Sequence, residues 1–326
     1  VILLFEVNRM GEEQDIITVT DLRKKYGSFE AVKGVSFSVK RGELFAFLGT
    51  NGAGKSTTID ILCTLIKKTS GKVVIDGYTL GEGKENNHIR KKIGVVFQES
   101  ILDERLTVYE NIMNRGQYYH LSKAQVQENY QFVTDYLKLD DIKEKKYSDL
   151  SGGQRRRADI ARAIIHKPTI LFLDEPTTGL DPQTRVFVWN AIKRLQEETN
   201  MTIFLTTHYM EEAAVADNVV VIKEGRLIAE GTPSQLKDQY AFDSLHMMFK
   251  QGVDPTAWFE NKQLDFTVKN SIYSLRVEST LQAFDILKGL EGKIESFEVI
   301  KGNMDDVFIH IIEEQGSSLP VKGSIA

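Results

Sequence analysis

The segment GTNGAGKST at 49–57 constrains the fold of this chain more than any other part of it. Its spacing, Gly-x-x-x-x-Gly-Lys-Ser, is typical of a phosphate-binding loop, and it follows the apolar run LFAFL and precedes a helical pattern. The start of such a helix directs N–H groups and a partial positive charge at an anion. The segment therefore predicts a nucleotide phosphate site; the alternative is a glycine-rich turn without a ligand.

The residues of this segment have separate expected roles. Its glycines allow backbone conformations that are forbidden to other residues, so that successive N–H groups can surround a phosphate. Lys55 supplies a positive charge for the β- and γ-phosphates, and the hydroxyl of Ser56 is placed to bind Mg²⁺. The expected nucleotide-binding residues are Gly49, Asn51, Gly52, Ala53, Gly54, Lys55, Ser56 and Thr57.

Two adjacent carboxylates form a second candidate element, because Asp174 and Glu175 end the apolar run ILFL. In a phosphate site the first carboxylate reaches Mg²⁺ through its water shell. The second can polarise the attacking water as a general base, a role that contributes about 10² to 10⁴ in rate. Taken alone, the pair is equally an acidic turn at the end of a strand; behind a phosphate loop, the catalytic interpretation is favoured.

Short apolar segments alternate with helical patterns over most of the chain. Strands are expected at 16–22, 35–39, 43–48, 72–76, 93–97, 170–174, 202–207, 218–222 and 226–231, a polar loop at 81–87 and a helix from the phosphate loop to about residue 66. The capping-box pairs Thr107 with Glu110 and Ser122 with Gln125 mark two helix starts. The prediction is an α/β fold: a P-loop ATPase core with a mainly parallel sheet, an antiparallel β element, an inserted α-helical subdomain and a small C-terminal α/β domain.

The domain organisation follows from the same patterns. We expect an N-terminal extension at 1–12, because the chain begins with Val1 and the conventional start could be Met10. The ATPase domain spans 13–240 with its helical insert at about 99–166, and two strand-helix units make an accessory domain at 241–316. A flexible tail follows at 317–326.

Composition limits the partners that such a chain can have. A formal net charge of −5 disfavours sequence-independent binding to nucleic acid. No apolar run approaches the roughly 20 residues that cross a bilayer. The single cysteine, Cys63, favours a reducing cytoplasm, and the six histidines lack metal-ligand spacing, so that no structural metal is expected.

The ordered motifs resemble those of an ATP-binding-cassette (ABC) nucleotide-binding domain over about 16–240. The sequence LSGGQ is decisive, because other P-loop families lack it. The motifs that carry the resemblance are the phosphate loop, Gln98, LSGGQ at 150–154, ILFLDEP at 170–176, Gly179-Leu180-Asp181 and His208.

Within one subunit the resemblance implies three further site residues. Tyr26 would stack on adenine, although an isolated tyrosine is equally an exposed strand residue. Gln98 would contact Mg²⁺ and the water, and is otherwise a hydrogen-bonding residue at a strand end. His208 would bind the γ-phosphate and orient the water of Glu175, whereas a lone histidine is more often structural.

The resemblance also implies a second copy of the chain. Ser151, Gly152, Gly153 and Gln154 start a helix and would meet the γ-phosphate held by the other subunit, while Asp181 would lie at the same dimer contact. Without the resemblance, the Ser-Gly-Gly sequence reads as an ordinary helix cap. The run Arg155-Arg156-Arg157 reads as a solvated helix face, with docking to a partner as the alternative.

The sequences RRRADIARAII, TTHYMEEA and NMDDVFIHII are similar to the branch of drug- and antibiotic-exporting ATPases that resemble daunorubicin-resistance transporters. Thr50 departs from the proline that is frequent at that position, without expected consequence. The accessory domain is expected to be structural or dimer-stabilising, before a regulatory or drug-binding role.

The implied function is that of a Mg²⁺-dependent ATPase subunit of an ABC exporter. It would work as a homodimer with a separate membrane permease subunit, at the inner face of the cell membrane, and power efflux of a drug-like or lipophilic compound. One alternative is a non-transport cassette ATPase that acts on ribosomes or nucleic acid, and another is a regulatory subunit with little hydrolysis. The carboxylate of Glu175 and the imidazole of His208 argue against the latter.

Overall fold

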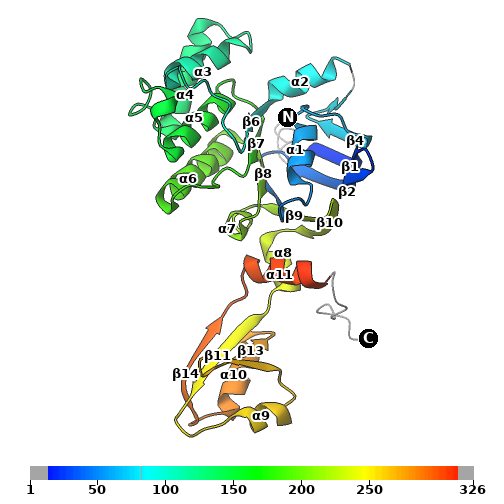
Figure 1. Ribbon diagram of the computed structural model, residues 1–326, viewed down its shortest axis with the longest axis vertical. Helices are drawn as coiled ribbons and strands as arrows, with labels where there is room; N and C mark the ends of the chain where they lie inside the picture. The colour runs from blue at the N-terminus through cyan, green and yellow to red at the C-terminus, as the bar shows by residue number, and fades with distance from the viewer. Residues whose placement is uncertain (1–13, 82, 315–326) are drawn as a thin grey trace, which may run out of the picture. The chain divides into compact units, whose positions relative to one another are not determined.

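The structure is a computed structural model that describes residues 14–81 and 83–314. The extension expected at 1–12 and the tail expected at 317–326 lie outside these ranges. The chain divides into two compact units, one that ends at Glu230 and one that begins at Gly231 (Figure 1).

The first unit is built on a six-stranded sheet. Strands β3, β6, β7, β8 and β9 pair in parallel, as predicted, and β10 adds an edge strand beside β9. Every residue of β3, β7 and β8 is buried, which explains why these strands are apolar at successive positions instead of alternate ones. The bounds are β3 Leu44–Gly49, β6 Ile93–Val96, β7 Ile170–Asp174, β8 Thr202–Thr207, β9 Asn218–Lys223 and β10 Arg226–Gly231.

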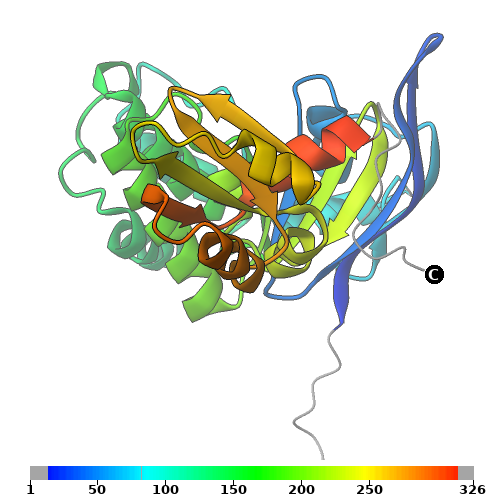
Figure 2. The ribbon, with the colours of Figure 1, turned by 90° about the horizontal axis from the view of Figure 1, so that it is seen from below.

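An antiparallel sheet with the order β2-β1-β4-β5 packs against this core. Its first two strands form a long hairpin, visible as the blue ribbon at the margin of Figure 2. Phe37 of the hairpin stacks on Phe45 of β3 with ring centroids 5.5 Å apart, which joins the two sheets through aromatic contacts. The bounds are β1 Asp15–Tyr26, β2 Phe29–Lys40, β4 Ser70–Ile75 and β5 Tyr78–Thr79.

Helices α3, α4 and α5 gather beside β6 and β7 and form the predicted helical insert (Figure 1). Both expected capping boxes are present, at Thr107 and at Ser122. The bounds of the helices in this unit are α1 Lys55–Leu62, α2 Glu85–Lys92, α3 Val108–Gln117, α4 Lys123–Leu137, the 3₁₀ turn η1 Tyr147–Asp149, α5 Gly152–Ile164, α6 Pro182–Thr199 and α7 Met210–Ala213.

Two local predictions are wrong. The polar loop expected through residue 87 ends earlier, because α2 begins at Glu85, whose carboxylate accepts a hydrogen bond from the backbone of Thr79, and buries Ile89. Helix α1 ends at Leu62 and not near residue 66, because Thr64 takes a positive φ of 62° that no helix continues.

The second unit has its own core beneath a four-stranded antiparallel sheet with the order β12-β13-β11-β14. The two predicted strand-helix units are present as β13 with α10 and β14 with α11. Strands β11 and β12 and helix α9 were not predicted, since the methionine-rich run of β11 carries no distinctive strand signal. The bounds are α8 Pro233–Tyr240, β11 Asp243–Phe249, α9 Thr256–Asn261, β12 Phe266–Lys269, β13 Ile272–Val277, α10 Thr280–Gly289, β14 Ile294–Ile300 and α11 Met304–Glu314.

Candidate active site

The phosphate loop connects β3 to α1. Gly54 caps α1 with a left-handed backbone (φ 105°), and within the described part of the chain no side chain caps the first N–H groups of this helix. By contrast, the side chains of Ser151 and Asp181 accept hydrogen bonds at the starts of α5 and α6. The open N–H groups of α1 therefore suit an anionic ligand.

Close packing explains two of the glycines. A Cβ atom at Gly49 would lie 2.5 Å from the carbonyl oxygen of Ile222, and one at Gly54 would lie 2.7 Å from that of Ala31. Gly52 has open space around it but a φ of 79°, which L side chains rarely adopt. These positions hold the loop in a curve that larger residues would disturb.

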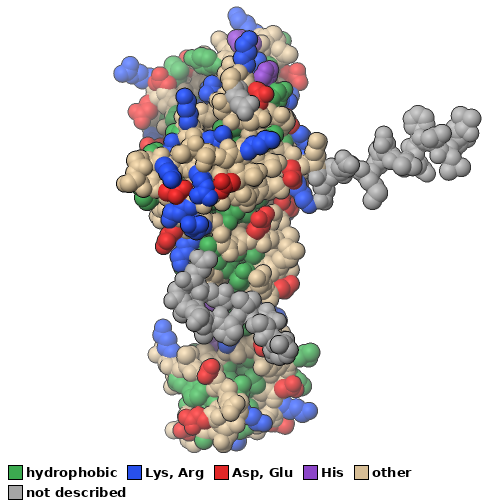
Figure 3. Space-filling view, turned by 90° about the vertical axis from the view of Figure 1, so that its right-hand side faces the viewer, with side chains coloured by type: hydrophobic (Ala, Val, Ile, Leu, Met, Phe, Trp, Pro, Cys, Tyr) green, Lys and Arg blue, Asp and Glu red, His purple; other side chains and the backbone are tan. Residues whose placement is uncertain are grey.

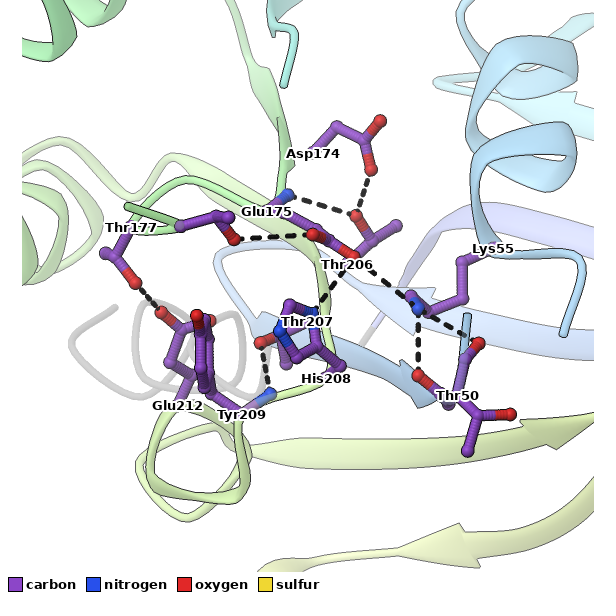
Figure 4. Close-up of polar contacts among 12 residues, drawn as sticks. Thr50, Lys55, Asp174, Glu175, Thr177, Thr206, Thr207, His208, Tyr209 and Glu212 are labelled. Atoms are coloured by element: carbon purple, nitrogen blue, oxygen red, sulfur yellow. Dashed lines mark hydrogen bonds and ion pairs between the residues drawn. The ribbon is translucent and has the colours of Figure 1, made fainter. Parts of the chain in front are cut away.

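Lys55 lies where the loop meets the carboxylates. Its Nζ donates hydrogen bonds to the carbonyl oxygens of Gly49 (2.8 Å) and Thr50 (3.2 Å) and lies 3.6 Å from Oε1 of Glu175 (Figure 4). Burial lowers the pKa of this ammonium, and the charge of Glu175 opposes the shift. The contact with Glu175 thus favours the charged form of Lys55 at a position that is shielded from water.

Asp174 is the last residue of β7 and Glu175 follows it, and their side chains point in different directions. The carboxylate of Asp174 is buried and accepts a hydrogen bond from the hydroxyl of Thr206 on β8 (Figure 4). Burial, followed by the charge of Glu175, raises the pKa of Asp174. An ionised Asp174 is therefore an unfavourable charge that a cation would relieve.

Glu175 has a strained backbone, with a φ of 45°. Its N–H donates to the carbonyl oxygen of Thr206 (3.1 Å), and its side chain lies beside His208, with Oε1 3.1 Å from Nδ1. Among the described residues Nδ1 of His208 has no hydrogen-bond partner, so that this contact is a close approach and not a hydrogen bond. The left-handed turn directs the carboxylate of Glu175 away from Asp174 and toward the phosphate loop.

A cleft of about 500 Å³ brings part of the predicted site together. Gly49, Ala53, Asp174 and His208 are not among the residues that line it. Gln98, which follows β6, faces the phosphate loop and Glu175 there. The lining residues are Phe29, Ala31, Asn51, Gly52, Gly54, Lys55, Ser56, Thr57, Gln98 and Glu175.

Tyr26 does not line this cleft. Its ring is half exposed and lies beneath the ammonium of Lys24, with Nζ 4.7 Å from the ring centroid. Phe29, its register partner across the β1–β2 turn, lines the cleft instead and is 63% exposed. Phe29 was not among the predicted site residues, although an aromatic residue directly after Gly27-Ser28 was a usable signal.

The LSGGQ residues also lie outside the cleft, at the exposed start of α5. Gly153 packs so closely that a Cβ atom there would lie 2.4 Å from Cγ2 of Thr184, while a Cβ atom at Gly152 would meet nothing within 4 Å. Thr184 also donates to the carboxylate of Asp181, through its N–H at 2.9 Å and its hydroxyl at 2.6 Å. Thr184 thus joins Gly153 and Asp181 in one surface, separate from the phosphate loop.

The arginine run is only partly a solvated face. Arg156 is 6% exposed and donates hydrogen bonds to backbone carbonyls next to the cleft, so that the prediction is wrong for this residue. Helical periodicity of α5 was the signal that could have found it, because Arg156 lies on the same face as the buried Asp159.

The side chains that could hold a divalent cation present oxygen atoms: the hydroxyl of Ser56, the amide of Gln98 and the carboxylate of Asp174. Such donors suit Mg²⁺. No cluster of three or more His, Cys, Asp or Glu residues that could hold a metal ion occurs within 14–81 and 83–314. The fit to Mg²⁺ thus depends on this mixed set, completed by phosphate oxygens.

A phosphate loop after β3, and a buried acid and a second carboxylate at the end of β7 in the same parallel sheet, define a P-loop ATPase. The comparisons with known proteins go further. Residues 32–178 match the model of the family described as ABC transporter. The chain belongs to this family, on the branch of ATP-binding subunits of exporters.

Two relatives illustrate the branch. The linearmycin resistance ATP-binding protein LnrL of Bacillus subtilis is 36% identical, over 82% of this chain and 86% of its own length. The daunorubicin/doxorubicin resistance ATP-binding protein DrrA of Streptomyces peucetius is 34% identical, over 90% and 91%. The resemblance to daunorubicin-resistance ATPases is thereby confirmed.

Solved structures match the cassette. The cbiO1 protein of Clostridium perfringens, part of the transporter complex cbiONQ, has a TM-score of 0.64 and 32% identity over 69% of this chain and 91% of its own. A dimeric post-hydrolysis structure of the cassette MJ0796 with ADP and Pi has a TM-score of 0.61 and 30% identity, over 66% and 98%. ATP binding and hydrolysis therefore belong to this chain as a member of the family.

Proposed function

We propose that this chain is the Mg²⁺-dependent ATPase subunit of an exporter, and that Glu175 is its general base. Glu175 lines the cleft opposite the phosphate loop and contacts both Lys55 and His208. In these roles Lys55 holds the β- and γ-phosphates, Glu175 accepts a proton from the attacking water, and His208 binds the γ-phosphate. Mg²⁺, held by Ser56, Gln98 and Asp174, would neutralise charge on the phosphate oxygens.

The observation that carries the proposal is the separation of the site into two parts. The phosphate loop and Glu175 share a cleft, whereas Ser151, Gly153 and Asp181 lie on another surface. A second copy can place its own helix start over the nucleotide, as the dimeric cassette structures suggest for their protein. We infer that each cleft is completed by the LSGGQ signature (residues 150–154) of a partner copy, with Phe29 as the aromatic surface for adenine in place of the expected Tyr26.

Substitution of Gly152 by Asp tests this arrangement. The side chain has free space, so that the fold and the nucleotide affinity of the chain's own cleft are expected to stay unchanged. The new carboxylate would face the phosphates of the other subunit, and like charges repel. We expect turnover of Mg-ATP to fall at least about tenfold, a loss of about 1.4 kcal/mol in transition-state binding.

The control for this substitution is Gly152→Ala, which adds a side chain without charge. Phosphate release, binding of a fluorescent ATP analogue and thermal unfolding are measured on both variants. Full turnover in Gly152→Asp would contradict a signature that acts on a partner's nucleotide.

A groove of about 390 Å³ next to the Gln98 segment suits the membrane subunit. Its rim carries Leu65, Ile101 and Tyr118, whose side chains are exposed, and three arginines line its wall, Arg90, Arg115 and Arg162. Apolar contacts with a basic wall fit an amphipathic cytoplasmic helix that carries an acidic side chain. No helix among the described residues is long and apolar enough to span a membrane itself.

We therefore expect Ile101→Glu to release the chain from its membrane subunit without changing its basal turnover. The charge would be buried against apolar atoms, which costs a few kcal/mol in contacts of this kind. The loss of binding is measured by how much membrane subunit copurifies with the tagged chain from detergent-solubilised membranes of the source organism. Val215→Glu is the matched control, since Val215 is equally exposed but lines a different groove.

The same preparation separates the rival functions. Recovery of ribosomes or DNA, and no polytopic membrane protein, would favour the non-transport cassette. Figure 3 shows acidic and basic side chains interspersed over one face, which is not the continuous basic surface typical of nucleic-acid binding. The names of the relatives favour drug-like or lipophilic cargo.

A further inference from the structure

Arg156 donates hydrogen bonds to the backbone of two segments that border the cleft, the one before Gln98 and the one at Asp174 and Glu175. Its Nη1 donates to the carbonyl oxygen of Phe97 at 2.7 Å, and Phe97 directly precedes Gln98. Its Nη2 donates to the carbonyl oxygens of Asp174 (3.2 Å) and Glu175 (3.1 Å), and its Nε donates to that of Pro176. One guanidinium thus holds the backbone next to Gln98, a proposed Mg²⁺ ligand, and at Glu175, the proposed general base.

The chemistry of these bonds requires arginine. All the hydrogen bonds that Arg156 makes with described residues end on carbonyl oxygens, so that none of them neutralises its charge. Burial of the guanidinium accordingly lowers its pKa. A planar fork of donors can reach several carbonyls at once, whereas a lysine ammonium is a compact point charge on a flexible stem.

The same helix makes a second connection to the Gln98 segment. Asp159, one turn after Arg156 on α5, accepts a hydrogen bond from the hydroxyl of Ser100 at 2.6 Å. It also accepts one from the hydroxyl of Tyr147 at 3.3 Å, in the turn before the signature. Helix α5 begins with the signature, so that a shift of its start moves both connections with it.

We propose that Arg156 is a positioning residue that makes Gln98 and Glu175 respond to the position of α5. When Ser151 and Gly153 meet the nucleotide of a second copy, the guanidinium aligns the backbone on both sides of the chain's own cleft. Binding at one cleft of the pair thereby promotes hydrolysis in the other. This inference rests on the proposed function, because it assumes the shared sites.

Arg156→Gln and Arg156→Lys test the connection in the full chain. Arg157→Gln is the matched control on the same helix, because Arg157 bonds to Lys138 and Asp141 in the helical insert instead. We expect kcat to fall at least about tenfold in Arg156→Gln, because glutamine cannot reach the carbonyl oxygens on both sides of the cleft at once. KM should change less than about twofold, since the phosphate loop is untouched. Lysine should restore little of the loss.

Hydrogen exchange provides a readout that does not depend on turnover. Without nucleotide, amides at 97–100 and 174–178 should exchange faster in Arg156→Gln than in wild type and in Arg157→Gln. Unchanged exchange in either segment overturns the positioning role. A loss of kcat in Arg157→Gln that equals the loss in Arg156→Gln, at the same fall in melting temperature, overturns it as well. A wild-type chain that binds ATP but fails to hydrolyse it overturns the proposed function, while the exchange result still decides whether Arg156 holds both segments.

Discussion

Glu175→Gln is expected to lower Mg-ATP turnover by about 10² to 10⁴ while ATP still binds. Glutamine keeps the size of the side chain but cannot accept a proton from water. The phosphate loop and Lys55 are unchanged, so that the nucleotide affinity depends on the same contacts as before. The substitution also removes a negative charge 3.6 Å from Nζ of Lys55, which leaves more positive charge for the phosphates.

The second expected result of Glu175→Gln is a stable pair of subunits. ATP that is bound but not hydrolysed keeps the two copies closed over their nucleotides. Size-exclusion chromatography with light scattering should give twice the monomer mass with Mg-ATP, and the monomer without it. Glu211→Gln is a suitable control, because Glu211 is also a glutamate but pairs with Arg185 outside this cleft, with a side chain that is 80% exposed. Full turnover in Glu175→Gln would contradict its assignment.

The motifs were predictable from sequence because each is a local pattern with a local cause. A Gly-rich segment between a strand and a helix can place its N–H groups in few ways, and Lys55, Ser56 and Gln98 lie in the cleft accordingly. The capping boxes at Thr107 and Ser122 are similarly local. The parallel core followed from strands that are apolar at every position.

The parts that sequence missed depend on tertiary contacts. Arg156 is chemically identical to its neighbours Arg155 and Arg157, so that residue type alone could not select it; helical periodicity places it on the face of Asp159, and the packing of α5 beside β6 and β7 buries that face. Phe29 and Tyr26 are register partners across one turn, and sequence pattern does not distinguish which of the two rings lines the cleft. The strand order of the antiparallel sheet in the second unit likewise depends on long-range pairing of β13 and β14 with β11.

Asp174→Asn is expected to abolish turnover and yet to raise the melting temperature of the chain without nucleotide or Mg²⁺. The carboxylate is buried, and its raised pKa means that the folded chain disfavours its charge relative to the unfolded chain. Asparagine is neutral and its Oδ1 can still accept the hydrogen bond from Thr206. We expect a rise of a few degrees, since about 1 kcal/mol shifts the melting temperature of a domain of this size by about 2–4 °C.

The difference in stability between Asp174→Asn and wild type is expected to depend on pH. The pKa of Asp174 in the folded chain lies above the ordinary value that applies to the unfolded chain. At pH values between these two pKa values the folded chain binds more protons than the unfolded chain, so that wild-type stability falls as pH rises through that range. The advantage of Asp174→Asn should therefore be full at neutral pH and shrink on acidification through the raised pKa. Asp181→Asn should show the opposite sign at neutral pH, because hydrogen bonds from Thr184 lower the pKa of Asp181. An Asp174→Asn protein that melts below wild type at neutral pH would show that this carboxylate stabilises the fold. Retained turnover with Mg-ATP would show that the carboxylate is not required to hold the cation.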